Sequence, residues 1–224
     1  KEGIRVLTGT KAEEVVGSGK VTGLKTSAGF LGCELLITAA GIRPNTEFLQ
    51  SSGLEMSKGT ILVDNTMKTS LEDVYAAGDC VMVTNRITGK PQWSPMGSSA
   101  NMEGRTLAQI LTGTRKTYPG VLGTGVVKLP GLHVGRTGLT QQQAEAAGYE
   151  VVTVLVPTDD KAHYYPGAGF FITKLIAEKE THKLLGVQVL GTGAVDKMVD
   201  IAVMGLNMGC LLYTSDAADD SISV

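Results

Sequence analysis

The stretch TMKTSLEDVYAAGDC, residues 66–80, decides the fold that we expect for this chain. Residues 74–77 favour a strand and become small toward its end, and Gly78 lets the backbone approach a ligand because it has no Cβ. Asp79 then stands at the tip of that strand. Ligands of open α/β sheets bind at the carboxyl ends of the strands, where an ionised carboxylate accepts hydrogen bonds from sugar hydroxyls. Read alone, the stretch is explained equally well by an ordinary Gly-Asp turn that ends a strand.

The segments on either side of this stretch add two more elements. LLITAAGIRPNTEFL, residues 35–49, predicts a buried strand that runs into Gly41, and a short helix with Thr46 as its cap follows it. WSPMGSSANMEGRTLAQILTG, residues 93–113, predicts a helix with Ser94 as N-cap and Pro95 in the first helical position. The free N–H groups at the start of such a helix favour negative charge. A plain amphipathic helix lying on the sheet has the same pattern.

In this order and at these separations, the three segments resemble the FAD-dependent pyridine nucleotide-disulphide oxidoreductases. Within that family the chain is most similar to the branch of coenzyme A-disulphide reductases and NADH oxidases, up to about Gly209. The resemblance implies that the protein uses FAD and NAD(P)H. The residues that it assigns to cofactor binding are Gly41, Asp73, Tyr75, Ala77, Gly78, Asp79, Ser94, Pro95 and Met96.

The resemblance also implies a role for most of these residues. Asp79 accepts hydrogen bonds from the ribityl chain of FAD, and Ala77 and Gly78 pack against its pyrophosphate end. The start of the helix at residues 94–96 faces the flavin pyrimidine. The resemblance implies that the glycine-rich phosphate loop and the single redox cysteine of the family precede Lys1. The sequence itself contains no GxGxxG loop and no CxxC pair. We therefore expect these residues by themselves to lack reductase activity and to bind FAD weakly or not at all.

The second half of the chain has a different pattern. A Gly- and Pro-containing linker at 117–125 precedes two strands, and a capping box of Thr140 and Gln143 then begins a helix that Gly148 closes. A strand stopped by Pro157, a hairpin and a final amphipathic helix follow. One face of that helix is formed by Val195, Met198, Val199, Ala202 and Leu206. The pattern predicts an antiparallel sheet with helices on one side, and it resembles the dimerisation domain of the same family.

The expected fold class is therefore α/β plus α+β, the C-terminal part of a doubly wound FAD/NAD(P)-binding domain followed by an antiparallel-sheet dimerisation domain. By resemblance, residues 1–44 are the trailing part of the NAD(P)H domain, with a hairpin near Gly17 and Gly19, and residues 45–116 are the end of the FAD domain. The same resemblance implies that residues 117–209 are an incomplete dimerisation domain, and that the full-length protein is a homodimer. Residues 210–224 break the pattern and look like a non-native tail.

The sequence HYYPGA, residues 163–168, resembles a loop of the coenzyme A-disulphide reductase branch. The resemblance implies that the first tyrosine, Tyr164, reaches the active site of the partner subunit. There its phenol can hydrogen-bond or protonate a thiolate leaving group. Packing of an aromatic ring at the dimer interface is the alternative, and His163 is expected to be a solvated loop residue.

Composition excludes several other classes. The 224 residues are 42% hydrophobic, and 22 acidic residues nearly balance 20 basic ones, so neither nucleic acid nor a membrane is an expected partner. Three scattered cysteines indicate no disulphide framework and no zinc site, which makes a cytoplasmic setting the default. The resemblance implies electron transfer from NAD(P)H through FAD to a disulphide such as coenzyme A disulphide. The alternatives are an NADH oxidase that reduces oxygen, a persulfide reductase, and a non-catalytic flavin-binding or dimerisation module.

Overall fold

The computed structural model describes residues 3–162 and 164–212. The chain forms two units, Lys1–Arg43 and Pro44–Val224, which are described separately. No helix within the described ranges combines the length and the hydrophobicity that a membrane span requires.

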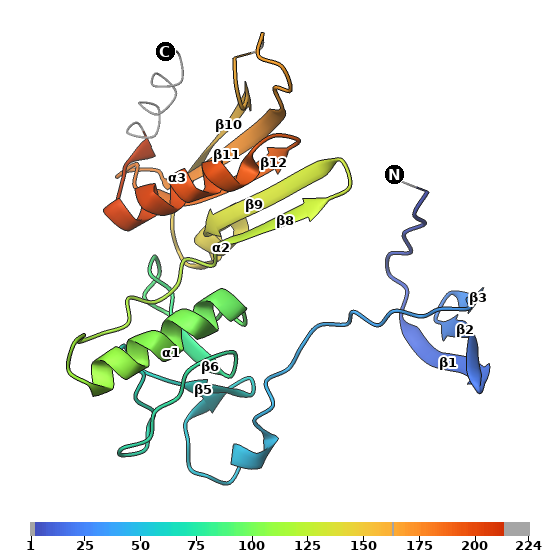
Figure 1. Cartoon of the computed structure of the whole chain (residues 1–224), viewed down its shortest axis with the longest axis horizontal. Helices are drawn as coiled ribbons and strands as arrows, with labels where there is room; N and C mark the ends of the chain where they lie inside the picture. Colours follow the sequence, from blue (N-terminus) through green and yellow to red (C-terminus); the bar gives the residue numbers. More distant parts are fainter. Residues whose placement is uncertain (1–2, 163, 213–224) are drawn as a thin grey trace. The chain divides into compact units, whose positions relative to one another are not determined.

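The first unit is a small antiparallel meander of three strands in the order β1-β2-β3 (Figure 1). The strands are β1 Ala12–Ser18, β2 Lys20–Thr26 and β3 Gly29–Gly32. Gly19 joins the first two with a positive φ of 73°, a conformation that residues with a Cβ seldom adopt. The predicted hairpin is thereby confirmed.

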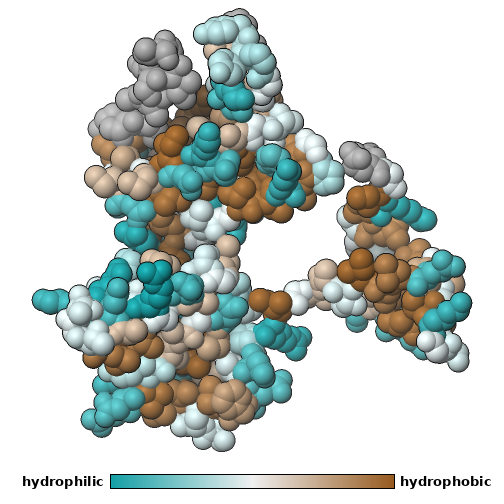
Figure 2. Space-filling view, in the orientation of Figure 1, coloured by the Kyte–Doolittle hydropathy of each residue, from teal (hydrophilic) through white to brown (hydrophobic). Residues whose placement is uncertain are grey.

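The strand expected at residues 35–40 is absent from the structure. Leu35 and Ile37 have exposed fractions of 76% and 79%, and Figure 2 shows hydrophobic surface on this unit. A buried strand needs neighbours for its backbone N–H and C=O groups, but β1, β2 and β3 pair only with one another. The prediction of a buried strand running into Gly41 is therefore wrong for this chain.

The second unit begins with a mixed sheet of four strands in the order β4-β5-β6-β7. Its strands are β4 Met56–Ser57, β5 Thr60–Leu62, β6 Val81–Thr84 and β7 Pro91–Trp93, and only β5 and β6 run parallel. Helix α1, Gly97–Leu111, lies on this sheet, because Leu107 and Ile110 pack against a core that contains Ile61, Val81 and Val83 (Figure 1).

One local prediction in this region needs correction, and the expected linker has surroundings that the sequence did not indicate. The helix expected after Asn45 is only a 3-10 turn, η1 Glu47–Leu49, and the hydroxyl of Thr46 donates to Gly59 O instead of capping it. The expected linker at 117–125 is partly buried, since Tyr118, Val121 and Leu122 are all less than 9% exposed. Its apolar side chains complete the core beside α1, so its glycines mark tight turns rather than an exposed connection.

A five-stranded antiparallel sheet in the order β10-β11-β12-β9-β8 makes up the rest of this unit. The strands are β8 Gly125–Leu129, β9 Leu132–Gly138, β10 Val151–Asp159, β11 Phe170–Glu178 and β12 Leu184–Gly191. The predicted hairpin of β11 and β12 is confirmed. The strand β10 does not stop at Pro157 but continues to Asp159, because it is an edge strand, where the missing N–H of proline is tolerated.

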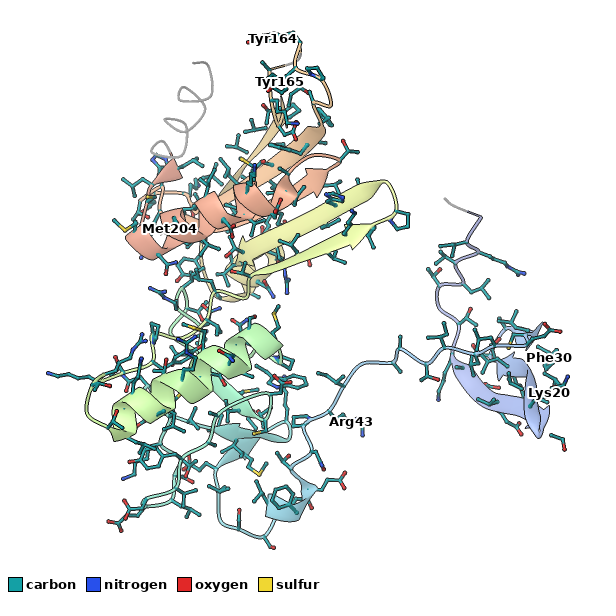
Figure 3. All side chains as sticks on the ribbon, viewed as in Figure 1. Lys20, Phe30, Arg43, Tyr164, Tyr165 and Met204 are labelled. Carbon is teal, nitrogen blue, oxygen red and sulfur yellow. The ribbon has the colours of Figure 1, made fainter. Side chains whose placement is uncertain are left out.

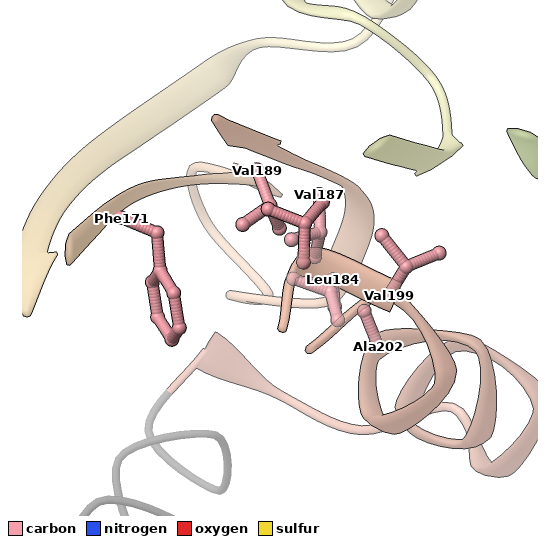
Figure 4. Close-up of a cluster of buried hydrophobic side chains, with 7 residues drawn as sticks. Phe171, Leu184, Val187, Val189, Val199 and Ala202 are labelled. Atoms are coloured by element: carbon pink, nitrogen blue, oxygen red, sulfur yellow. The ribbon is translucent and has the colours of Figure 1, made fainter. Parts of the chain in front are cut away.

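Helix α3, Val195–Met208, covers one face of this sheet. Figure 4 shows its Val199 and Ala202 beside Val187, Val189 and Leu184, so the predicted apolar face is confirmed. These side chains are almost fully buried. At about 25 cal/mol per Å² of buried apolar surface, their packing stabilises the domain more than helix propensity does.

The second helix of this domain, α2 Gln141–Ala146, has the predicted capping box, because Thr140 Oγ1 accepts from Gln143 N while the Gln143 side chain accepts from Thr140 N. It lies on the opposite face of the sheet from α3. Lys174 Nζ donates to α2 at Gln141 (2.7 Å), whereas Phe171, an odd number of residues away on β11, packs with α3. The prediction that the helices share one side is therefore wrong.

Candidate functional site

The candidate site is the turn formed by Gly78 and Asp79. The strand predicted at residues 74–77 is absent, and only Tyr75 makes an isolated bridge, to Lys68. The backbone folds back on itself there, since Ala76 N donates to Met67 O at 3.1 Å. Asp79 consequently stands just before β6 rather than at the end of a strand. Gly78 has a φ of 100°, which favours glycine.

The carboxylate of Asp79 is available to a ligand. Asp79 is exposed, and its carboxylate makes no hydrogen bond or ion pair within residues 3–162 and 164–212. Its backbone is nevertheless fixed, because Trp93 Nε1 donates to Asp79 O at 2.7 Å. A fixed backbone with an exposed acceptor suits the binding of hydroxyl groups.

The start of α1 lies at the same end of the sheet as this turn. Strands β6 and β7 are antiparallel with Met82 paired to Trp93, so the residues that precede β6 lie beside those that follow β7. Ser94, Pro95 and Met96 follow β7 directly. The structure thus brings the predicted residues 77–79 and 94–96 to the same end of the sheet.

The details of this helix start differ from the prediction. Met96 is the N-cap, without a side-chain hydrogen bond, and Pro95 lies outside the helix. Ser94 Oγ instead shares a hydrogen bond of 3.0 Å with Ser99 Oγ. Because Met96 N donates to Ser94 O at 2.8 Å, the three residues form a tight turn that delays the helix until Gly97. The first N–H groups of α1 have neither a capping side chain nor an acidic residue in the first turn.

Sequence reasoning missed a buried carboxylate below the turn. Glu103 on α1 is 2% exposed, and its Oε2 accepts a hydrogen bond from Gly78 N at 2.8 Å. Burial raises the pKa of Glu103 to about 7, the hydrogen bond from Gly78 opposes that rise, and the charge of Asp79 adds to it. A signal was present, since Glu103 stands four and seven residues before the inward-facing Leu107 and Ile110.

The remaining predicted residues lie elsewhere. Gly41 belongs to the first unit, where it is exposed with a φ of 92°. Asp73 is exposed with a φ of 57° in the loop before the turn, and Tyr75 is half-buried. Tyr164 is 79% exposed and lies at the tip of the β10–β11 hairpin (Figure 3). The expectation for His163 lies outside the described residues.

A comparison with protein families accounts for most of the chain. A model described as pyridine nucleotide-disulphide oxidoreductase matches residues 1–103, and the model of the dimerisation domain of the same family matches residues 126–222. The chain belongs to the pyridine nucleotide-disulphide oxidoreductase family. The second match extends to residue 222. The non-native tail expected at residues 210–224 is not tested by it and stays a prediction. The dimerisation domain is the part through which members of this family pair.

Individual members of the family are similar over nearly all of the chain. The NAD(P)H coenzyme A polysulfide/persulfide reductase of Pyrococcus horikoshii is 36% identical over 192 residues, which cover 85% of this chain and 43% of that protein. The chain therefore spans less than half the length of this curated relative.

Solved structures agree with that comparison. A NAD-dependent persulfide reductase from A. fulgidus superimposes with a TM-score of 0.87 at 36% identity, over 95% of this chain and 40% of that one. An FAD-dependent pyridine nucleotide-disulphide oxidoreductase from Desulfovibrio vulgaris gives a TM-score of 0.75 at 33% identity, over 91% of this chain and 49% of that one.

Proposed function

We propose that the whole protein is a flavoprotein oxidoreductase that passes electrons from NAD(P)H through FAD to a disulphide of a small thiol, such as coenzyme A disulphide. The present chain would contribute part of the flavin site and the dimerisation domain. One observation supports this proposal most directly. The exposed carboxylate of Asp79 and the uncapped start of α1 lie at the same end of the sheet.

The residues at this end of the sheet fit the groups that FAD presents. A carboxylate accepts hydrogen bonds only, so Asp79 would hold the hydroxyls of the ribityl chain. Gly78 leaves open space on the side of the turn where a Cβ would stand, since no heavy atom lies within 4 Å of that position. The first turn of α1 would favour negative charge on the flavin by about 0.3–1 kcal/mol. When bound, FAD supplies the electron-transfer chemistry.

Tyr164 would act in a second subunit of a homodimer. Its exposure at the tip of a hairpin leaves the phenol accessible from outside the sheet (Figure 3). We propose that it reaches the active site of the partner and hydrogen-bonds or protonates a departing thiolate.

Reduction of a persulfide is the second candidate function. The names of the relatives from Pyrococcus horikoshii and A. fulgidus favour it, because both are persulfide reductases. Rates of NAD(P)H oxidation by the whole protein with coenzyme A disulphide, a persulfide and oxygen would distinguish the candidates. A preference for oxygen would contradict both.

The flavin role of Asp79 can be tested on the 224-residue chain with ¹⁵N NMR, which detects weak binding. We expect FAD to shift the amide resonances of Gly78, Asp79 and the first turn of α1. The change Asp79→Asn should weaken FAD binding roughly tenfold, because hydrogen bonds to a charged group contribute about 1.5–3 kcal/mol. Asp200→Asn, which alters an exposed aspartate on α3, is the matched control. Shifts confined to other residues, or equal affinities of the two variants, would contradict the assignment.

A further inference from the structure

Glu103 places an ionisable group inside the core directly below the candidate flavin site. Its side chain is 2% exposed, and Thr106, one turn further along α1, is 1% exposed. The described part of the chain contains no basic side chain in an ion pair with Glu103. A buried carboxylate without a compensating cation is costly, so its retention here needs a reason.

The groups that interact with Glu103 come from the turn and from the segment after α1. The turn supplies Asp79, whose negative charge raises the pKa of Glu103, and Cys80, whose pKa is raised by burial and by the charges of Glu103 and Asp79. The segment after α1 supplies Tyr118, whose pKa is raised to about 12 by burial and by Glu103. Two cations lower the pKa of Tyr118 in turn. They are Arg115 and Arg86, the latter from the segment after β6. Burial and the charge of Asp79 therefore both disfavour the ionised form of Glu103.

Among the described residues, the one hydrogen bond that the Glu103 side chain accepts comes from Gly78, the residue on which the turn depends. Gly78 adopts a φ of 100°, and its carbonyl accepts from Val81 N at 3.1 Å at the start of β6. Its N–H points inward to Glu103 Oε2 at 2.8 Å. With both backbone groups of Gly78 directed into the protein, the next residue, Asp79, is left with its side chain exposed. Glu103 thus accepts one of the two hydrogen bonds that hold the backbone of Gly78, and Val81 N donates the other.

We propose that Glu103 is a positioning residue of the flavin site, which holds the Gly78 N–H and thereby presents Asp79 to the ligand, and that protonation of Glu103 weakens this hold. The inference rests on the proposed flavin role of Asp79 and deepens it. A charged acceptor forms a hydrogen bond about twice as strong as a neutral one, so the turn is held most firmly when Glu103 is ionised. FAD affinity should then rise as the pH rises through neutrality.

The first test needs no FAD. In ¹⁵N NMR spectra of the 224-residue chain, the Gly78 amide proton should shift with pH, with a midpoint near the pKa of about 7. In Glu103→Gln the amide oxygen keeps the hydrogen bond but cannot titrate, so this midpoint should disappear while the Gly78 resonance stays close to its position in the wild type. Glu145→Gln, on the exposed surface of α2, is the matched control and should behave as the wild type.

The second test repeats the FAD titration at several pH values. Affinity of the wild type should increase by roughly fivefold from the protonated to the ionised form of Glu103, and that of Glu103→Gln should stay constant. Glu103→Ala leaves Gly78 N without an acceptor and should bind FAD more weakly than Glu103→Gln at every pH. Glutamine at this position should therefore restore the binding that alanine loses.

The two proposals fail in different ways. A Gly78 resonance that ignores pH, or that still titrates near neutrality in Glu103→Gln, overturns the positioning role whether or not FAD binds. A normal Gly78 titration, together with FAD-induced shifts that are confined to residues other than Gly78, Asp79 and the first turn of α1, overturns the flavin role of Asp79, while it supports the hold of Glu103 on the turn.

Discussion

Replacement of Glu103 by glutamine should make the protein more stable at neutral and alkaline pH. Glutamine has nearly the same shape and can accept the hydrogen bond from Gly78 N, but it carries no charge that burial would penalise. The change therefore isolates the cost of ionising a side chain that is only 2% exposed.

The size and sign follow from the pKa. The pKa of Glu103 is raised from its ordinary value of 4.5 to about 7 in the folded chain. Well below pH 4.5 the carboxyl group is protonated in both the folded and the unfolded chain, so it imposes no penalty. Between 4.5 and about 7 the unfolded chain releases the proton while the folded chain retains it, so the free energy of unfolding falls as the pH rises. At about 1.4 kcal/mol per pH unit, the loss amounts to about 3 kcal/mol.

Urea denaturation of the wild type and of Glu103→Gln at a series of pH values would measure this difference. Trp93 is the only tryptophan of the chain and donates to Asp79 O, so its fluorescence reports unfolding at the site itself. Other groups titrate alike in both proteins and cancel. We expect equal stabilities near pH 4 and an advantage of about 3 kcal/mol for the variant near pH 8. A difference that does not change with pH, or one as small as that of Glu145→Gln, would refute the reasoning.

Two further predictions concern the five-stranded sheet. The hydroxyl of Thr173 is buried without a hydrogen-bond partner among the described residues, so Thr173→Val should raise the free energy of unfolding by about 1 kcal/mol, whereas Thr137→Val, which removes a bonded hydroxyl, should lower it by about 1 kcal/mol. Equal effects in urea denaturation would contradict this. A Cβ on Gly186 would lie 1.9 Å from the carbonyl oxygen of Leu139, so Gly186→Ala should cost about 3 kcal/mol or more, while Gly125→Ala, with open space in the same sheet, should cost less than about 1 kcal/mol. Similar melting temperatures of the two alanine variants would disprove that contact.

Features that depend on neighbouring residues in the sequence were predictable. The capping box of Thr140 and Gln143 is a pattern within one turn, and the apolar face of α3 repeats at helical spacing. The family resemblance rested on three segments in a fixed order, and the comparisons confirm it. Residues 77–79 and 94–96 were expected at one site, and the antiparallel pairing of β6 with β7 places them at one end of the sheet.

Features that depend on distant residues were not predictable in the same way. Leu35 and Ile37 have the pattern of a buried strand, but a strand exists only where other strands accept its hydrogen bonds. The opposite placement of α2 and α3 depends on which face of β11 each helix contacts. Burial of Glu103 depends on Gly78, which is 25 residues away in the sequence, because the Gly78 N–H donates a hydrogen bond to the Glu103 carboxylate. Charge alone predicts an exposed glutamate.

The burial of the segment at 117–125 decides where the folded chain can be cleaved. A protease needs an extended, accessible stretch of backbone, and Tyr118, Val121 and Leu122 are held in the core, with Tyr118 N bonded to Asn65 O and Val121 N to Thr84 O. Residues 33–43, in contrast, belong to no helix or strand, and Leu35 and Ile37 are exposed. Limited digestion should therefore release the first unit and leave the two sheets of the second unit joined as a single resistant core.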